Sequence, residues 1–295
     1  MATLLHLIGG DGGHSFTFNG VHNGATLKKI GVALDYWQIK AVRAELTDGR
    51  VETFGQSHSF HKEFTFSPHE RITKLSQWGN GIGTRLGGIR FWTSSGREFS
   101  AIMTSWPLVT EYSINLGSGV CLGLEGRCGH AIDNMGFLFI NAIQSSVLTD
   151  MTYPSLAWYK PQHKCAYSRS VTKSTTWSNT VNIESTVSMS VKAGIPGVVE
   201  VTGGFSLTVG AEQTTSMSSS QTITESDEVN VMVPAGKTVS VEVSVGRAVI
   251  NLPFSATVKI TCMNGSELRF QSKGNYNGVA YTAVDVKVTE SQKML

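Results

Sequence analysis

Two glycine-rich stretches of the sequence combine backbone amides with an acidic side chain in a pattern that suits hydroxyl recognition. The first is Gly9–Gly13, and the second is Gly126–Phe137, which contains Asp133. A glycine loop lets backbone N–H groups approach a ligand closely, and a carboxylate beside them accepts hydrogen bonds from hydroxyl groups. Such a mixed set of donors and acceptors is suited to binding sugars. Turn geometry is the alternative explanation, because glycine also dominates ordinary turns.

The other reactive residue types show no pattern that predicts catalysis or metal binding. His58 and His61 are three residues apart and have no third ligand nearby in the sequence, so we expect no metal site. Cys121 and Cys128 could face each other across a hairpin, but four cysteines without a CxxC spacing do not indicate a disulfide framework. No nucleophile–base set and no pair of catalytic acids stands out. We therefore predict a protein that is not an enzyme and has no cofactor.

Composition excludes several function classes. The 24 Lys and Arg residues are scattered and the net charge is only +2, whereas nucleic-acid binders concentrate basic charge, so we expect no nucleic-acid partner. The 31 glycines and the abundant Val, Thr and Ser indicate an all-β fold. No apolar run is long enough for a membrane-spanning helix, and the N-terminus lacks the basic region of a signal peptide. We expect a soluble protein that is cytoplasmic or secreted by an unconventional route.

The first half of the chain must position the glycine loops on short strands. Alternating or apolar runs separated by glycine turns continue to about residue 147, and such a series predicts a sandwich, a barrel or a prism. The clearest expected strands are Leu4–Ile8, Ser15–Phe18, Ile30–Leu34, Trp37–Leu46, Arg71–Leu75, Gly88–Trp92 and Leu138–Ile143. Residues 148–167 contain two prolines and little alternation, so they are interpreted as a linker to a second domain.

A long amphipathic hairpin is predicted over residues 181–211. Apolar residues occupy odd positions on both sides of an expected tip at Ala193–Gly197, which gives each strand one apolar and one polar face. Serine and threonine make up 24 of the 59 residues from 168 to 226. That composition is typical of β pore-formers, whose strands face lipid on one side and water on the other, although an ordinary strand on a soluble core shows the same alternation.

The predicted membrane hairpin has two sets of residues. We expect the lipid-facing set to be Val187, Met189, Val191, Ile195, Val199, Val201, Phe205, Leu207 and Val209. We expect the lumen-facing set to be Ser188, Ser190, Lys192, Glu200, Thr202, Ser206 and Thr208. Trp177 belongs either to an aromatic belt at the membrane interface or to a packed core. Before insertion the apolar face must be hidden, so we expect it to lie against the second domain's own sheet.

The remainder of the chain predicts a closing β-sandwich. Its expected strands are short, with Pro234–Lys237 and Asn264-Gly265 as turns, the latter being a strong hairpin signal. The expected strands are Val229–Val233, Thr238–Val245, Ala248–Leu252, Thr257–Thr261, Leu268–Gln271 and Val279–Val288.

Three motifs of the first half resemble the jacalin-related lectins. Gly129–Asp133 fits the GxxxD sugar loop of that family, within the wider string GRxGxxxDxxGF. Gly9–Gly13 fits its N-terminal glycine loop, and Ile89–Arg97 resembles its strand-and-turn motif. The resemblance covers about residues 3–143 and implies a β-prism of three four-stranded sheets that binds mannose-type glycans without metal. The sugar-binding residues that it implies are Gly13, Gly129, His130, Ala131 and Asp133.

The second half resembles the aerolysin-type pore-forming module. The Ser/Thr-rich arms, the amphipathic hairpin and the strands PAGKTVSVEV and LPFSATVKI carry this resemblance. A jacalin-like lectin ahead of such a module is the arrangement of the natterin-like proteins. The resemblance implies a lectin domain over 1–147 and an elongated module over 148–295. It also implies a soluble monomer or dimer that binds mannose-rich glycans, assembles as a ring and inserts β-hairpins into a membrane. The alternative is a lectin whose second domain serves only oligomerisation or vesicle trafficking.

Overall fold

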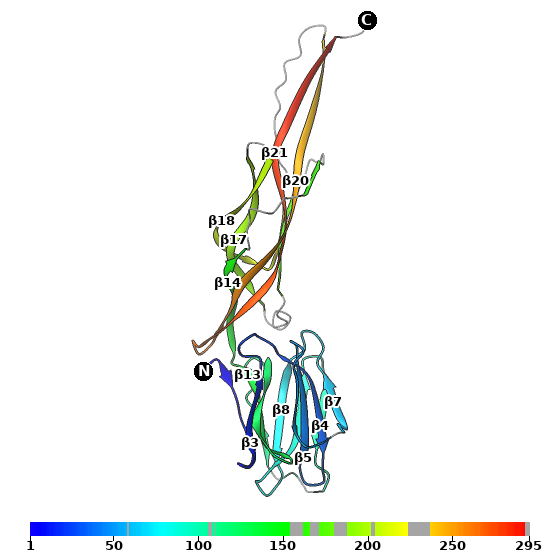
Figure 1. Ribbon diagram of the computed structural model, residues 1–295, viewed down its shortest axis with the longest axis vertical. Helices are drawn as coiled ribbons and strands as arrows, with labels where there is room; N and C mark the ends of the chain where they lie inside the picture. The colour runs from blue at the N-terminus through cyan, green and yellow to red at the C-terminus, as the bar shows by residue number, and fades with distance from the viewer. Residues whose placement is uncertain are drawn as a thin grey trace. The chain divides into compact units, whose positions relative to one another are not determined.

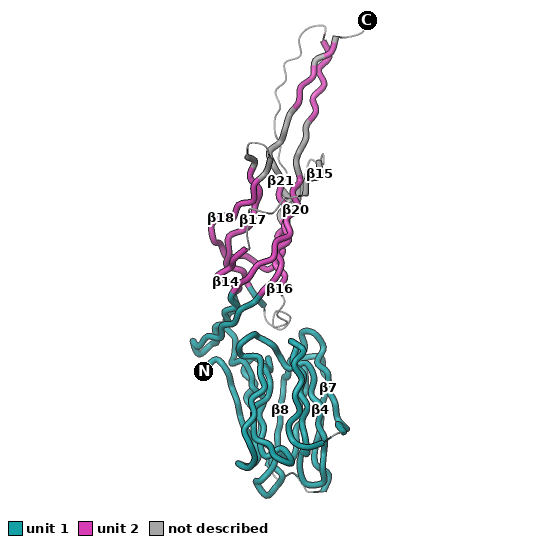
Figure 2. Tube along the Cα trace, viewed as in Figure 1, with its two compact units in different colours: residues 1–147, 181–189, 257–272 teal, residues 148–180, 190–256, 273–295 magenta. Residues whose placement is uncertain are grey.

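The computed structural model describes residues 1–57, 59–105, 108, 110–153, 162–165, 171–179, 188–201, 204–223 and 237–292. Every regular element in these ranges is a β-strand, which confirms the predicted all-β class. The chain forms two compact units, shown in teal and magenta in Figure 2. Unit 1 comprises residues 1–147, 181–189 and 257–272, and unit 2 comprises residues 148–180, 190–256 and 273–295.

Unit 1 contains the predicted β-prism, with three antiparallel sheets (Figure 1). The first sheet contains β1 (Thr3–Leu4), β2 (Ile8–Gly9), β3 (His14–Asn19), β12 (Cys121–Cys128) and β13 (Ile132–Ile140), with β1 and β2 both paired to β13. The second contains β4 (Leu27–Leu34), β5 (Ile39–Leu46), β6 (Val51–Gly55) and β7 (Lys62–Thr65). The third contains β8 (Ile72–Gly79), β9 (Leu86–Thr93), β10 (Glu98–Ile102) and β11 (Glu111–Ser113).

Apolar side chains from all three sheets fill the centre of the prism. Strand β13 is buried along its whole length, so it forms one wall of this core. Phe91 of β9 lies at the middle of an aromatic cluster, with ring centroids 4.9 Å from Phe99, 5.1 Å from Phe64 and 6.4 Å from Phe137. Each of these rings buries a large apolar area, and offset and edge-to-face pairs add to that burial. This core fixes the positions of the loops at the strand ends.

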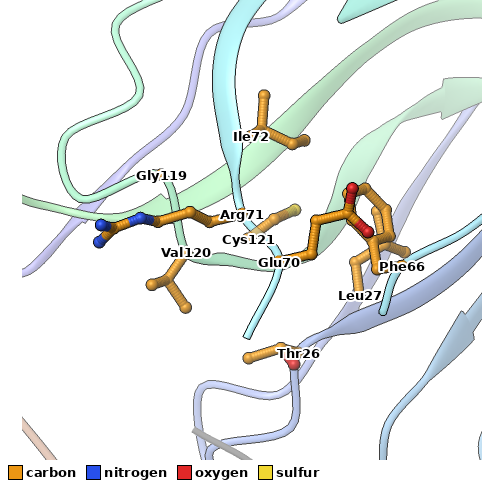
Figure 3. Close-up of a pocket in the computed structure, with 9 residues that line it drawn as sticks. All are labelled: Thr26, Leu27, Phe66, Glu70, Arg71, Ile72, Gly119, Val120 and Cys121. Atoms are coloured by element: carbon orange, nitrogen blue, oxygen red, sulfur yellow. The ribbon is translucent and has the colours of Figure 1, made fainter. Parts of the chain in front are cut away.

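A buried carboxylate joins two sheets of the prism at a small cavity (Figure 3). Glu70 accepts hydrogen bonds from the Arg97 guanidinium, from the Thr93 hydroxyl and, at 2.8 Å, from the amide of Ser67. Burial acts to raise the pKa of Glu70, but these hydrogen bonds and the charge of Arg97 outweigh burial and lower the pKa to about 2. Glu70 is therefore a structural anchor that stays ionised at neutral pH.

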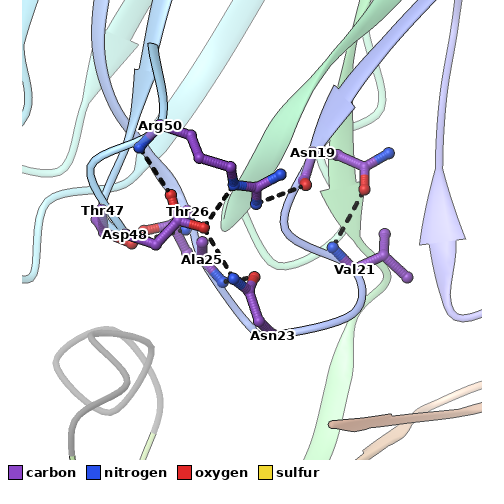
Figure 4. Close-up of polar contacts among 8 residues, drawn as sticks. All are labelled: Asn19, Val21, Asn23, Ala25, Thr26, Thr47, Asp48 and Arg50. Carbon is purple, nitrogen blue, oxygen red and sulfur yellow. Dashed lines mark hydrogen bonds and ion pairs between the residues drawn. The ribbon is translucent and has the colours of Figure 1, made fainter.

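A second polar network ties the β3–β4 loop to the β5–β6 turn (Figure 4). The Asp48 carboxylate accepts hydrogen bonds from Asn23 Nδ2 at 2.8 Å and from Arg50 Nε at 2.7 Å. The Arg50 guanidinium also donates to the carbonyl of Asn19 at 3.0 Å. All of these side chains bond to one another or to backbone, so the network is a support for two turns.

The described strands of unit 2 all belong to one eight-stranded sheet, and three strands of this sheet also have residues in unit 1. Its members are β14 (Ile143–Thr152), β15 (Gln162–Cys165), β16 (Val171–Asn179), β17 (Ser190–Val201), β18 (Gly204–Ser216), β19 (Ser218–Ile223), β20 (Lys237–Cys262) and β21 (Glu267–Gln292). The order is β18-β17-β14-β20-β21-β16-β19, with β15 paired to β20. The predicted linker over 148–167 is therefore wrong where the structure describes it, because β14 and β15 belong to this sheet.

The predicted closing β-sandwich is also wrong, because its short strands are parts of two long ones. Strands β20 and β21, orange and red in Figure 1, each have 26 residues. Pro253 lies inside β20, and the alternation of buried and exposed residues continues on both sides of it. Proline has a backbone angle compatible with a strand and lacks only one ladder donor, so it did not mark a strand end. Val229–Val233 lies outside the described residues.

The hairpin turn predicted at Asn264-Gly265 is present between β20 and β21. Gly265 has a φ of +78° and its amide donates to the carbonyl of Cys262 at 2.9 Å. Residues 257–272 belong to unit 1, where the amide of Met263 donates to the carbonyl of Ala142 at 2.7 Å. The predicted second domain, 148–295, thus contains a turn that packs with the first unit.

Candidate functional site

The two glycine loops meet at the Asp133 carboxylate, near the start of β13. The amide of Gly10 donates to the carbonyl of Asp133 at 2.9 Å, and Asn134 Nδ2 donates to the carbonyl of Gly10 at 2.6 Å. A Cβ atom on Gly12 would lie 2.5 Å from Asp133 Oδ1. A Cβ atom on Gly13 would overlap with Asp133 Oδ2 and lie 2.6 Å from the Cys128 carbonyl. Only glycine leaves room for the loop to approach this carboxylate.

The loop between β12 and β13 presents the other predicted sugar-binding residues. The β12–β13 ladder ends at the pair of Cys128 and Ile132, so the amides of His130 and Ala131 are not committed to the sheet. The amide of Gly129 donates to the carbonyl of Ala131 at 3.0 Å and closes the loop. The structure therefore brings all five predicted residues together: Gly13, Gly129, His130, Ala131 and Asp133.

His130 has an exposed side chain with a partner from another sheet. Its Nδ1 lies 2.7 Å from Gln56 Oε1, which follows β6. This contact orients the imidazole at the edge of the loop and leaves the backbone amide in place beside Asp133.

Two arginines complete the site, and neither was predicted from the sequence. Arg85, which precedes β9, forms an ion pair with Asp133 Oδ1. The Asp133 side chain is only 2% exposed and that of Arg85 is 33% exposed, so the guanidinium covers the carboxylate from the solvent side. Arg127 donates from Nε to the carbonyl of Gly12 at 2.9 Å and from a terminal nitrogen to that of Gly13 at 2.8 Å. Arg127 thus fixes the first glycine loop.

The signals for these arginines differ. Arg127 belongs to the string GRxGxxxDxxGF, so its place beside the sugar loop was visible in the sequence. Arg85 follows a glycine-rich turn far from Asp133 in the chain, and no local pattern relates the two. Side chains of the same turn line an open hollow of about 290 Å³ beside the ion pair. The hollow is lined by Trp37, Gln38, Asn80, Ile82, Thr84 and Arg85.

The predicted hairpin exists, but its turn is not at Ala193–Gly197. Strands β17 and β18 pair from Ser190 with Ser216 to Val201 with Gly204, so the connection lies between Val201 and Gly204. The register shifts between Gly194 and Pro196 of β17, which pair with Glu212 and Val209 of β18. One residue separates the first two and two residues separate their partners, so β18 carries the extra residue of a bulge. The Gly/Pro signal marked the strand opposite this bulge instead of a turn.

This bulge also changes which residues share a face. Residues directly opposite in an antiparallel pair point to the same side. Val191 is opposite Thr215, but beyond the bulge Val198 is opposite Leu207 and Val199 is opposite Ser206. The prediction that odd residues of both strands form one face is therefore wrong for this structure beyond the bulge, because a one-residue shift reverses the alternation.

The described side chains of the two predicted sets have mixed burial. In the lipid-facing set, Val191 and Leu207 are buried, Met189 and Ile195 are half-buried, and Val199 and Val209 are 44% and 37% exposed. In the lumen-facing set, Ser188, Lys192, Ser206 and Thr208 are exposed and Ser190 is half-buried. Val187 and Thr202 lie outside the described residues, as do the side chains of Glu200, Val201 and Phe205.

Two tyrosines bond to the β17 backbone opposite the bulge, and a tryptophan packs against one of them. The Tyr153 hydroxyl donates to the carbonyl of Gly194 at 3.1 Å, and the Tyr276 hydroxyl donates to the carbonyl of Pro196 at 3.2 Å. Trp177 is buried with its ring 5.1 Å from that of Tyr276, which places it in a packed core. Burial raises the pKa of both tyrosines, so their hydroxyls remain donors. We call Tyr153, Trp177 and Tyr276 the aromatic clamp.

The described residues give no support to other kinds of site. They contain no group of three or more His, Cys, Asp or Glu side chains placed to hold a metal ion. No helix among them is long and apolar enough to cross a membrane. Cys121 and Cys128 lie on the same strand, β12, with free thiols, so they do not face each other across a hairpin. Burial raises the pKa of the Cys121 thiol to about 12, which makes it unreactive.

Comparison with known proteins identifies the family. The crystal structure of the lamprey immune protein is 48% identical in sequence, covers 99% of both chains and superposes with a TM-score of 0.92. The chain belongs to the family of the lamprey immune protein. A family model described as the jacalin-like lectin domain matches residues 5–138, so this family member carries a lectin domain in its first half.

Two further solved structures match about half of the chain. Malaysian banana lectin is 22% identical, with a TM-score of 0.39, and the match covers 47% of this chain and 97% of that one. A mannose-specific jacalin-related lectin from Morus nigra, solved with mannose, is 20% identical with a TM-score of 0.37 and coverage of 48% and 96%. Among curated proteins, no sequence matches the chain.

Proposed function

We propose that the lectin half binds mannose-type glycans at the Asp133 site. The proposal rests on one observation: two glycine loops converge on a single carboxylate, Asp133, beside loop amides that the sheet ladder does not use. In this proposal, sugar hydroxyls donate to Asp133, and the amides of His130 and Ala131 donate to sugar oxygens. Because the carboxylate is nearly covered, the Arg85 side chain shifts when a sugar arrives. Its guanidinium then donates to the sugar as well as to Asp133.

Retention on a mannan column tests this site. We expect Asp133→Ala to abolish retention, because a hydrogen bond to a charged group contributes about 1.5–3 kcal/mol and several hydroxyls depend on this one. Asp11→Ala is the matched control, since Asp11 lies in the first glycine loop, which approaches Asp133, and has an exposed side chain. Retention that survives Asp133→Ala would remove the assignment, and so would equal losses in both variants.

We further propose that the protein forms membrane pores with its β17–β18 hairpin. Protomers gathered on glycans assemble as a ring, and each contributes one hairpin to a closed barrel. Closure is required because an open sheet edge in lipid leaves backbone groups unpaired. The support is the Ser/Thr-rich hairpin with exposed Val199 and Val209 beside exposed Ser206 and Thr208, a combination that a soluble strand pair does not need.

The bulge adds a specific structural change to the proposed insertion of the hairpin. In the described register, the predicted lipid-facing residues of the two strands point to different sides beyond Gly194. Removing the bulge shifts the pairing by one residue and brings the odd positions of both strands onto one face. The tyrosines of the aromatic clamp bond to two carbonyls of β17 opposite the bulge, so the clamp maintains the register of the resting form. Insertion therefore requires the clamp to release Gly194 and Pro196.

Leakage of dye from glycan-bearing vesicles tests pore formation. Val209→Arg and Thr208→Arg are matched variants, since both positions are exposed in the resting structure and are adjacent on β18. A basic side chain facing lipid near the midplane costs about 2–4 kcal/mol, so Val209→Arg should suppress leakage while Thr208→Arg, facing the lumen, retains it. Equal effects would contradict the proposed faces.

The wild-type protein decides between the proposal and its alternative. Vesicles that stay intact at acid and neutral pH and after protease treatment would rule out a pore. That outcome favours a lectin whose second unit serves only oligomerisation or vesicle trafficking. Cleavage of an oligosaccharide by the pure protein would instead indicate an enzyme.

A further inference from the structure

Three large apolar side chains are exposed on two loops of the lectin half. Tyr36 and Trp37, between β4 and β5, are 66% and 51% exposed, and Ile82, between β8 and β9, is 71% exposed. Trp37 and Ile82 line the same hollow as Arg85, the residue that covers Asp133. We call Tyr36, Trp37 and Ile82 the apolar rim. The rim is therefore continuous with the sugar site.

Backbone hydrogen bonds hold both loops in place. The amide of Asp35 donates to the carbonyl of Gln38 at 3.0 Å, and the amide of Ser105 donates to the carbonyl of Tyr36 at 3.0 Å. In the second loop the amide of Asn80 donates to the carbonyl of Arg85 at 2.9 Å. The exposed apolar groups of the rim are thus presented on fixed loops, and a cluster of such groups marks a contact surface.

We propose that the apolar rim inserts into the interface of the lipid bilayer that carries the glycan. Tryptophan and tyrosine favour this layer because one end of the ring system is apolar and the other forms hydrogen bonds. The rim loops carry one acidic and one basic side chain, Asp35 and Arg85, so the surface suits an uncharged headgroup region. A sugar on a glycolipid lies close to the bilayer, and a lectin that binds it must bring the neighbouring loops against lipid.

This inference rests on the proposed sugar binding and adds a second contact to it. The sugar contact and the lipid contact both involve one face of unit 1. Once the sugar is bound, the lipid contact therefore forms within the same complex and not from free solution. The two affinities then reinforce each other through effective concentration. The inference predicts tighter binding to a membrane-anchored glycan than to the same glycan in solution, before any hairpin is inserted.

Flotation of the full chain with phosphatidylcholine vesicles, with and without a mannose-headed glycolipid, tests the rim. Trp37→Ser and Ile82→Ser should each weaken vesicle binding about tenfold, the effect of withdrawing roughly half of a large apolar side chain from lipid. Neither variant should change the affinity for a soluble mannose oligosaccharide measured by calorimetry. Val51→Ser is the control: Val51 is 43% exposed and pairs with Glu45, at the end of β5 remote from the rim.

Two results would overturn the inference. One is vesicle binding by the rim variants equal to that of Val51→Ser. The other is an equal loss of affinity for the soluble oligosaccharide, which would make the hollow a sugar subsite. If the wild type binds no soluble sugar, the proposed sugar binding is refuted separately from the proposed lipid contact of the rim. The rim is then judged on plain vesicles at high lipid concentration, where Trp37→Ser must still bind more weakly than Val51→Ser. A thermal melt of each variant verifies folding.

Discussion

Substitution of one glycine should abolish sugar binding without unfolding the prism. Gly13 has a φ of +64° and lies against both Asp133 and Cys128. An alanine there adds the strain of a left-handed backbone, about 1–2 kcal/mol, and its Cβ overlaps with the carboxylate and the Cys128 carbonyl. Gly96 provides a matched control, because its φ is +74° but no atom lies within 4 Å of an added Cβ.

The two variants separate backbone strain from steric displacement. Gly96→Ala should lower the free energy of unfolding by about 1–2 kcal/mol and leave sugar binding unchanged. Gly13→Ala should lose at least the same stability. It should also displace the loop or the carboxylate, with a loss of about 1.5–3 kcal/mol for each charged hydrogen bond to the sugar. That loss corresponds to a decrease in affinity of roughly 10- to 100-fold or more.

Calorimetric titration with a mannose oligosaccharide and denaturant unfolding of both variants provide the measurements. The reasoning requires both variants to remain folded and only Gly13→Ala to lose affinity. It is refuted if Gly13→Ala binds the sugar as tightly as the wild type, since the carboxylate would then tolerate the overlap. It is equally refuted if Gly96→Ala loses affinity to the same extent, since strain alone would then explain the effect.

Three further predictions concern the groups that support the two candidate sites. The pKa of Glu70 is lowered from 4.5 to about 2, so its contribution to the free energy of unfolding is complete above pH 4.5 and is lost as the pH falls toward 2. Glu70→Gln should therefore remove up to about 3 kcal/mol of acid-dependent stability in denaturant titrations. Tyr276→Phe removes one bond of the aromatic clamp, so vesicle leakage should begin faster, and unchanged or slower leakage would contradict a restraining role. Arg85→Met leaves the buried Asp133 charge without its cation and should destabilise the protein by about 3–5 kcal/mol. Adding Asp133→Asn to this variant should restore stability, measured by thermal melts, but should not restore sugar binding, measured by titration.

Local sequence patterns were sufficient to predict much of the lectin half. Gly129 to Asp133 are neighbours in the chain, and a loop that needs glycine at set positions is visible in any single sequence. The glycine turns and alternating runs likewise predicted an all-β fold, and the Asn264-Gly265 signal located the β20–β21 turn. These features depend on backbone angles and side-chain alternation within a few residues.

Only the tertiary structure decided the partners of these local elements. Alternation with a period of two gives the faces of a strand but not its register, and one extra residue in β18, opposite Gly194–Pro196, reverses the faces beyond it. Pairing within the sheet also carried β20 through Pro253, whereas the expected strand Ala248–Leu252 ended one residue earlier. Arg85 reaches Asp133 because two sheets of the prism pack together, and no spacing in the sequence records that contact. The sequence by itself therefore determined the glycine loop that ends at Asp133, whereas packing determined the charge that covers this carboxylate and the register of the hairpin.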